Sequence, residues 1–158
     1  MKTLTVYYSR SGKTEKIAEA IQKSIGGDIE RILDQKDRSG ILGWLSAGRD
    51  AGSKSLTSIK EVEKKPAGYD VIIIGSPTWG GTVSAPIRTY FNQYNTSFRK
   101  VACFSTGDGE DTDALDEMDG LLGNKVFAKM HLVRKEVDSN HYHEKVEKFV
   151  EKIKNFMQ

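Results

Sequence analysis

Six consecutive residues near the start of the chain have the composition of a phosphate-binding loop: Ser9, Arg10, Ser11, Gly12, Lys13 and Thr14. They follow the apolar run 4–8 and precede a segment with helical periodicity, so the order is strand, hydroxyl-rich loop and helix start. The unpaired N–H groups and the positive dipole end at a helix start favour an anion, and the hydroxyls can donate further hydrogen bonds. The sequence therefore predicts a phosphate site here.

The last three of these residues, Gly12-Lys13-Thr14, also match the end of the P-loop of nucleotide hydrolases. That motif requires another glycine five positions earlier, and Tyr7 stands there. The P-loop interpretation is therefore excluded. A simpler interpretation, in which the Ser and Thr residues only cap the helix, remains open.

Two further loops rich in Gly, Ser and Thr follow predicted strands. The first contains Pro77, Thr78, Trp79, Gly80 and Gly81, and the second contains Ser105, Thr106, Gly107, Asp108 and Gly109. A tryptophan on a glycine loop is expected to be exposed and to stack on a flat aromatic ligand, while the glycines allow close approach of the backbone. Together with the phosphate loop, they predict a ligand with a phosphate at one end and a planar heteroaromatic ring at the other.

Five strands and five helices are predicted around these loops. The strands are expected at 3–8, 28–33, 69–75, 100–105 and 126–133, and the helices at 14–25, 42–52, 85–94, 112–122 and 140–157. Strands that alternate with helices predict an α/β fold, a parallel sheet covered on both faces, within a single domain over 1–158. All three loops then follow strands at the edge where such sheets bind ligands.

The three loops resemble those of the flavodoxin family. The first resembles the flavodoxin phosphate loop, Thr78-Trp79-Gly80 the loop whose tryptophan covers one face of the flavin, and Ser105-Thr106-Gly107-Asp108 the loop whose amides bond the pyrimidine edge. The resemblance covers the whole chain and implies a short-chain, three-layer, doubly wound five-stranded parallel sheet. It also implies strand order 2-1-3-4-5 with non-covalent FMN at the switch point, for which flavodoxins are the standard example.

Three features depart from the usual flavodoxin pattern. Lys13 stands where flavodoxins usually have Asn, and Arg10 adds a further positive charge to the phosphate loop. The third loop has no aromatic residue, so the second flavin face is either open or covered by Trp44. Carrier flavodoxins are typically strongly acidic, whereas this chain has a net charge of +2, which weakens the inference that it uses the same partners.

The leading functional hypothesis is an electron carrier that exchanges electrons with a redox partner protein through FMN. The alternative is an FMN-dependent NAD(P)H:quinone-type oxidoreductase acting on a small quinone-like acceptor, and no catalytic acid or base stands out for it. A flavin-free module of the same fold is a third hypothesis, against which Trp79 and the complete set of loop hydroxyls argue. His141 and His143 are two residues apart and share no helical face, so no metal site is predicted.

Other classes of function are disfavoured by composition. The net charge of +2 and the lack of a basic stripe argue against nucleic acid. No apolar stretch approaches the roughly 20 residues of a membrane span, and no export leader is visible. Cys103 is the only cysteine, which suits a reducing, cytoplasmic setting. A monomer or weak dimer is expected.

Overall fold

A parallel sheet forms the centre of the molecule, in a computed structural model that describes residues 1–36, 40–52 and 55–158 and, within these, all side chains but those of 50–52. Five strands are parallel and lie in the order β2-β1-β3-β5-β6. Their bounds are β1 Thr3–Tyr7, β2 Asp28–Arg31, β3 Val71–Trp79, β5 Lys100–Gly107 and β6 Val126–Val133. Because β5 and β6 are the fourth and fifth strands of the parallel set, the predicted α/β class and the order 2-1-3-4-5 are confirmed.

The centre of this sheet is apolar on both faces, which is why its sequence reads as a continuous run. Four successive residues of β3, Val71 to Ile74, are fully buried although their side chains alternate between the faces. Ile73 lies opposite Thr5 of β1 and Ala102 of β5, so β3 is flanked by parallel strands on both sides.

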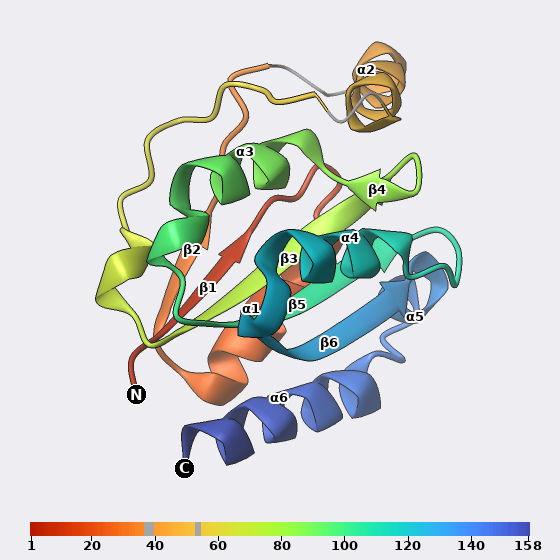
Figure 1. Cartoon of the computed structure of the whole chain (residues 1–158). Helices are drawn as coiled ribbons and strands as arrows, with labels where there is room; N and C mark the ends of the chain where they lie inside the picture. The colour runs from red at the N-terminus through yellow and green to blue at the C-terminus, as the bar shows by residue number, and fades with distance from the viewer. Residues whose placement is uncertain (37–39, 53–54) are drawn as a thin grey trace.

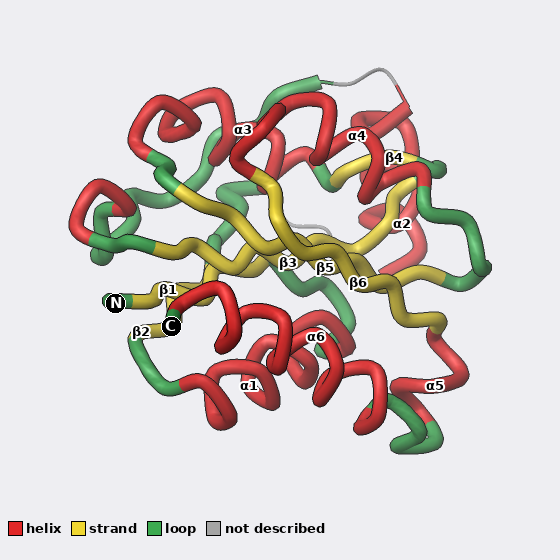
Figure 2. Tube along the Cα trace, turned by 60° about the horizontal axis from the view of Figure 1, so that its bottom comes forward, coloured by secondary structure: helices red, strands yellow, loops and turns green. Residues whose placement is uncertain are grey.

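Helices cover both faces of the sheet (Figures 1 and 2). The helix bounds are α1 Lys13–Ile25, α2 Gly40–Gly52, α3 Ala85–Tyr94, α4 Asp113–Leu122, α5 Arg134–Asp138 and α6 His143–Met157, with single 3-10 turns at Pro66–Gly68, Asn95–Ser97 and Gly123–Lys125. One apolar core joins the sheet to α1 and α6, and the other joins it to α3 and α4, where Ala47 of α2 also packs. The result is a three-layer arrangement with the sheet in the middle.

The end of β3 differs from the prediction. The strand continues to Trp79 and pairs with a short antiparallel strand, β4 (Thr82–Val83). The two residues between them, Gly80 and Gly81, have φ of 55° and 75°, the backbone signature of a tight hairpin turn that glycine adopts without strain. All five residues of the predicted second loop, 77–81, therefore lie in β3 or in the turn of a β-hairpin.

The segment between β2 and β3 contains the helix predicted at 42–52, observed as α2. Residues 37–39 and 53–54, which precede and follow this helix, lie outside the described residues. After α2 the chain is tied to the body by Thr57, whose N–H donates to Thr89 Oγ1 at 3.0 Å, and whose carbonyl accepts from the same hydroxyl at 2.9 Å. The segment is thus attached to α3, and further along it is also attached to the sheet, where the N–H of Glu63 donates to Glu30 of β2 at 3.0 Å.

The helices that follow β6 also differ from the prediction. The last helix begins at His143 rather than near 140, and α5 precedes it, directly after β6. The position of α5 matters for the site described below, because it lies beside the first and third loops. Among the described helices, none has the length and apolar character that crossing a bilayer requires.

Candidate functional site

A cavity of about 500 Å³ lies at the carboxyl ends of the strands, where the three predicted loops meet. From those loops it is lined by Arg10, Ser11, Lys13, Thr14, Pro77, Thr78, Trp79, Gly80, Thr106, Gly107 and Asp108. The other predicted residues, Ser9, Gly12, Gly81, Ser105 and Gly109, belong to the same loops but do not line it. The structure therefore brings most of the predicted residues to one place.

The first loop is built to present its polar groups at the start of α1. Gly12 has a φ of 90°, and its N–H donates to the buried Ser9 Oγ at 3.0 Å, so Ser9 shapes the loop from inside. The hydroxyls of Thr14 and Thr106 share a buried hydrogen bond of 2.8 Å, which joins the first loop to the third. Ser11 and Arg10 are exposed at the cavity, in position to meet an anion.

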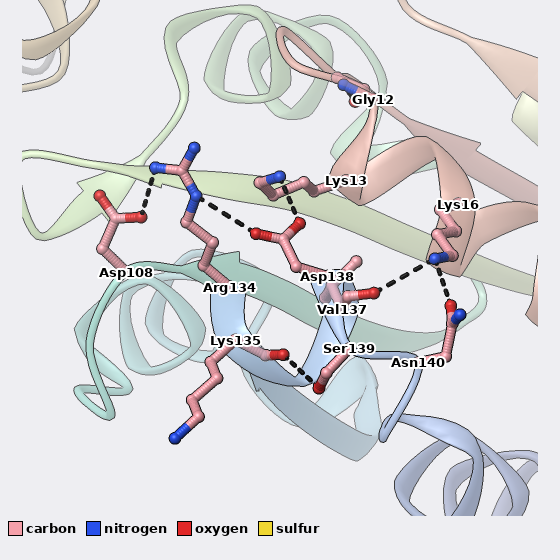
Figure 3. A network of polar contacts seen from close by, with 11 residues as sticks. Gly12, Lys13, Lys16, Asp108, Arg134, Lys135, Val137, Asp138, Ser139 and Asn140 are labelled. Carbon is pink, nitrogen blue, oxygen red and sulfur yellow. Dashed lines mark hydrogen bonds and ion pairs between the residues drawn. The ribbon is translucent and has the colours of Figure 1, made fainter.

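Ion pairs connect the first loop to the third through α5 (Figure 3). Lys13 Nζ lies 2.6 Å from Asp138 Oδ1, and Asp138 also faces Arg134 at 3.6 Å. Arg134 in turn lies 3.6 Å from Asp108. The hydrogen bond from Lys13 holds the pKa of Asp138 below its usual value, so this carboxyl is ionised at neutral pH.

The cavity wall is predominantly basic. Among the described residues that line it, four are basic and one is acidic: Arg10, Lys13, Arg49 and Arg134 against Asp108. Even when Asp138, which pairs with Lys13 without lining the cavity, is counted, the four basic side chains outnumber the two carboxylates. The site therefore carries a net positive charge, which suits a doubly charged phosphate better than a neutral ligand.

Trp79, which the sequence placed on an exposed loop, is in fact only 7% exposed. It is the last residue of β3 and pairs with Thr82 across the hairpin. Its ring packs edge-on against Tyr8, with ring centroids 5.3 Å apart and an interplanar angle of 89°. The prediction of an exposed tryptophan is wrong, because the chain remains a strand at this point and directs the ring into the core.

A buried ion pair holds the hairpin in place. Arg88 of α3 pairs with Glu117 of α4, and their side chains are 10% and 14% exposed. Both also bond to Val83 of β4: Arg88 Nη2 donates to its carbonyl and its N–H donates to Glu117 Oε2, each at 3.4 Å. Two helices thus clamp the strand that follows Gly81, and so fix the second loop.

His131 fixes the third loop and was missed from the sequence. Its ring lies between two groups of the loop, with Nδ1 2.7 Å from Ser105 Oγ and Nε2 2.8 Å from the carbonyl oxygen of Gly109. Because a carbonyl only accepts, Nε2 carries a proton. The only signal in the sequence was its position near the carboxyl end of the last strand, next to the strand that carries the loop.

One buried polar atom at the cavity is available to a ligand. In the part of the chain that the structure describes, Thr78 Oγ1 is buried and has no hydrogen-bond partner. Thr78 lines the cavity and lies beside Gly107, where an added Cβ would approach Oγ1 to 3.1 Å. A buried hydroxyl without a partner is costly, so this atom favours a ligand with a polar edge.

Helix α2 contributes side chains that the predicted site did not include. Trp44 and Leu45 line the cavity and are 58% and 54% exposed. The closest approach of α2 to the second loop is at Gly80, where an added Cβ would lie 3.4 Å from the carbonyl oxygen of Gly48. The cavity thus has an apolar wall opposite the sheet edge, in addition to its basic end.

Comparison with known proteins places this architecture among flavin-binding folds. A family model described as flavodoxin matches residues 2–153. A flavodoxin from Synechocystis sp. (strain ATCC 27184 / PCC 6803 / Kazusa) is 28% identical over 125 residues, which cover 76% of this chain. The match spans 61% of that relative, so this chain accounts for less than two thirds of its length.

Solved structures show the same arrangement. A flavoprotein from Lactobacillus acidophilus NCFM, determined in complex with FMN, is 28% identical with a TM-score of 0.71, and the match covers 87% of this chain and 97% of that one. Oxidised flavodoxin 1 from Bacillus cereus is 18% identical with a TM-score of 0.57, covering 98% of both chains. At that identity the second likeness supports the fold alone.

Proposed function

Because the chain belongs to the flavodoxin family, we propose that it is an electron-transfer protein that holds FMN among its three loops. The observation that carries the proposal is the cavity itself. It has a basic, hydroxyl-lined end at the start of α1 and an aromatic, apolar wall made by α2 and the end of β3. A phosphorylated planar ring requires these two kinds of surface together.

The residues present fit the two ends of FMN. Ser11, Thr14 and the N–H groups at the start of α1 would hold the phosphate, with Arg10 and Lys13 supplying charge. The buried Thr78 hydroxyl and the backbone of Gly107 and Asp108 would meet the polar edge of the ring. Bound FMN supplies the redox chemistry, while the chain binds it, orients it and limits its contact with water.

Salt and phosphate test this assignment directly. Purified apoprotein is titrated with FMN and with riboflavin, which lacks the phosphate, at low and high ionic strength, and binding is followed by flavin fluorescence. FMN is expected to bind more tightly, and its advantage over riboflavin shrinks as salt screens the basic wall. If FMN is not retained, or binds no better than riboflavin, the proposal fails.

A charge variant sharpens the same test. Arg10 is exposed and lines the cavity, so Arg10→Gln should weaken FMN binding by about two- to fivefold, the usual worth of an exposed charge pair. Riboflavin binding should not change. Lys154→Gln, at an exposed position on α6 away from the cavity, is the matched control and should alter neither.

The exposed apolar side chains of α2 favour a second candidate function, that of an FMN-dependent NAD(P)H:quinone-type oxidoreductase. Ile41 and Leu42 are 80% and 82% exposed, and the neighbouring Leu45 lines the cavity, a surface on which a small aromatic acceptor could rest. Steady turnover of NAD(P)H with a soluble quinone by the FMN-loaded protein would support the reductase. Reduction by dithionite without such turnover would support a carrier that serves a redox partner protein.

The setting of this function is also part of the proposal. The single cysteine is buried in β5 and can form no disulfide within the chain, which supports a reducing compartment such as the cytoplasm. We expect a monomer or a weak dimer, and sedimentation of the FMN-loaded protein at several concentrations would decide between them.

A further inference from the structure

We propose that Trp44 of α2, and not Trp79 of β3, stacks on the face of the FMN ring. The inference rests on the proposed function, since it concerns how the same site holds FMN. These are the two tryptophans of the chain, and both line the cavity. They differ in how much of each ring is available to a ligand.

Trp79 is part of the wall and has little face to offer. It is 7% exposed, its backbone pairs with Thr82, and its ring meets Tyr8 edge-on. Turning the ring outward would remove an aromatic contact and leave a void in the core, which packed interiors resist. With 7% of its surface exposed, Trp79 therefore offers little area on which a ligand ring could stack.

Trp44 has the opposite character. More than half of its surface is exposed, at 58%, although it borders a cavity that could bury it. Large apolar side chains gathered in the open, as Trp44, Leu45 and Ile41 are, commonly mark a surface that a partner or ligand covers. A flat ring entering the cavity would bury the indole and the leucine together.

The helix that carries Trp44 is anchored well enough to position it. Ala47 is 2% exposed and belongs to the core shared with α3 and α4, and Gly43, one turn earlier, is also buried. These two residues lie on one side of α2, four positions apart. Trp44 and Gly48, likewise four apart, line the cavity, so the anchored side of the helix sets the direction of the indole.

Chemical modification of Trp44 gives the direct test. N-bromosuccinimide oxidises accessible indoles, and peptide mass spectrometry assigns the product to each tryptophan. In the apoprotein Trp44 should react and Trp79 should not. Saturating FMN or riboflavin should slow oxidation of Trp44 at least tenfold, whereas inorganic phosphate, which fills only the basic end, should not. If Trp44 in the FMN-loaded protein reacts as fast as in the apoprotein, the inference is wrong.

Affinity provides a second readout. Trp44→Leu should raise the Kd for FMN about tenfold, since stacking of an aromatic ring on a base or flavin has roughly this worth. Trp44→Phe keeps an aromatic face and should raise the Kd by less than about threefold. Both variants should unfold at the wild-type temperature, because Trp44 is exposed. Unchanged affinity in Trp44→Leu would overturn the inference.

Wild-type binding separates this inference from the function on which it rests. If the wild-type protein does not bind FMN, the proposed function fails and the stacking assignment fails with it. If the wild type binds FMN while Trp44 stays reactive and its replacement has no effect, the function stands and only the assignment to Trp44 is overturned.

Discussion

The ion pair between Arg88 and Glu117 offers a quantitative test of how the second loop is held. Glu117→Gln keeps the shape of the side chain and an oxygen for the N–H of Val83, but removes the negative charge. The guanidinium of Arg88 then stays in a mostly buried position without its counter-charge. The second bond that Arg88 makes, to the carbonyl of Val83, does not neutralise it.

The expected loss of stability follows from burial. Removing one partner of a fully buried pair costs about 3–5 kcal/mol, because an uncompensated charge is left behind. With side chains 10% and 14% exposed, water can reach the pair in part. We therefore expect the free energy of unfolding to fall by about 3 kcal/mol, near the lower limit of that range. For a chain of this length the melting temperature should drop by about 6–12 °C.

Urea unfolding of the apoprotein at neutral pH, followed by circular dichroism, measures this free energy. The cycle is completed by Arg88→Met and by the double variant, which has no buried charge and should lose less stability than either single variant. Glu147→Gln, at an exposed position on α6, is the control. The reasoning is refuted if Glu117→Gln costs less than about 1 kcal/mol, or if the double variant is less stable than both single variants.

Three further predictions concern single positions in the sheet. Gly75→Ala in β3 should destabilise the protein by about 1–3 kcal/mol or more in a urea titration, because the new Cβ would lie 2.1 Å from the ring of Phe104. Gly120→Ala in α4 is the control: the glycine has open space around it, so the substitution should be neutral or stabilising. His131→Ala should weaken FMN binding several-fold, because the third loop loses both of its contacts with the imidazole. A flavin titration measures this affinity, and an unchanged value would contradict the assigned role of His131. Burial raises the pKa of the Cys103 thiol, so its thiolate is scarce at pH 8, and Ellman's reagent should react with it only after unfolding in urea.

The fold was predictable because its signals are local. Each parallel strand is an uninterrupted apolar run or an alternating one, and the helices α1, α3, α4 and α6 each have a regular apolar stripe. The strand formed by Val71–Ile74 and the helix Ala85–Tyr94 were recognisable on these grounds alone. The convergence of the three loops then followed from topology, since parallel strands bring their carboxyl ends to one edge.

What could not be predicted depends on contacts between distant parts of the chain. The burial of Trp79 requires Tyr8 as a packing partner, and nothing near Trp79 in the sequence indicates that ring. His131 acts on groups 26 and 22 residues away, so its neighbours in sequence give no sign of its role. The pair Gly80 and Gly81 was a readable hairpin signal, but was interpreted as room for a ligand instead.

The charged contacts around α5 have a consequence for the order of events during synthesis. Lys13 meets Asp138 across 125 residues of chain, and Asp108 meets Arg134 through the same short helix. During synthesis the phosphate loop is therefore made 125 residues before its ionic partner. A nascent chain that has not yet reached α5 therefore lacks the ionic link between its first and third loops.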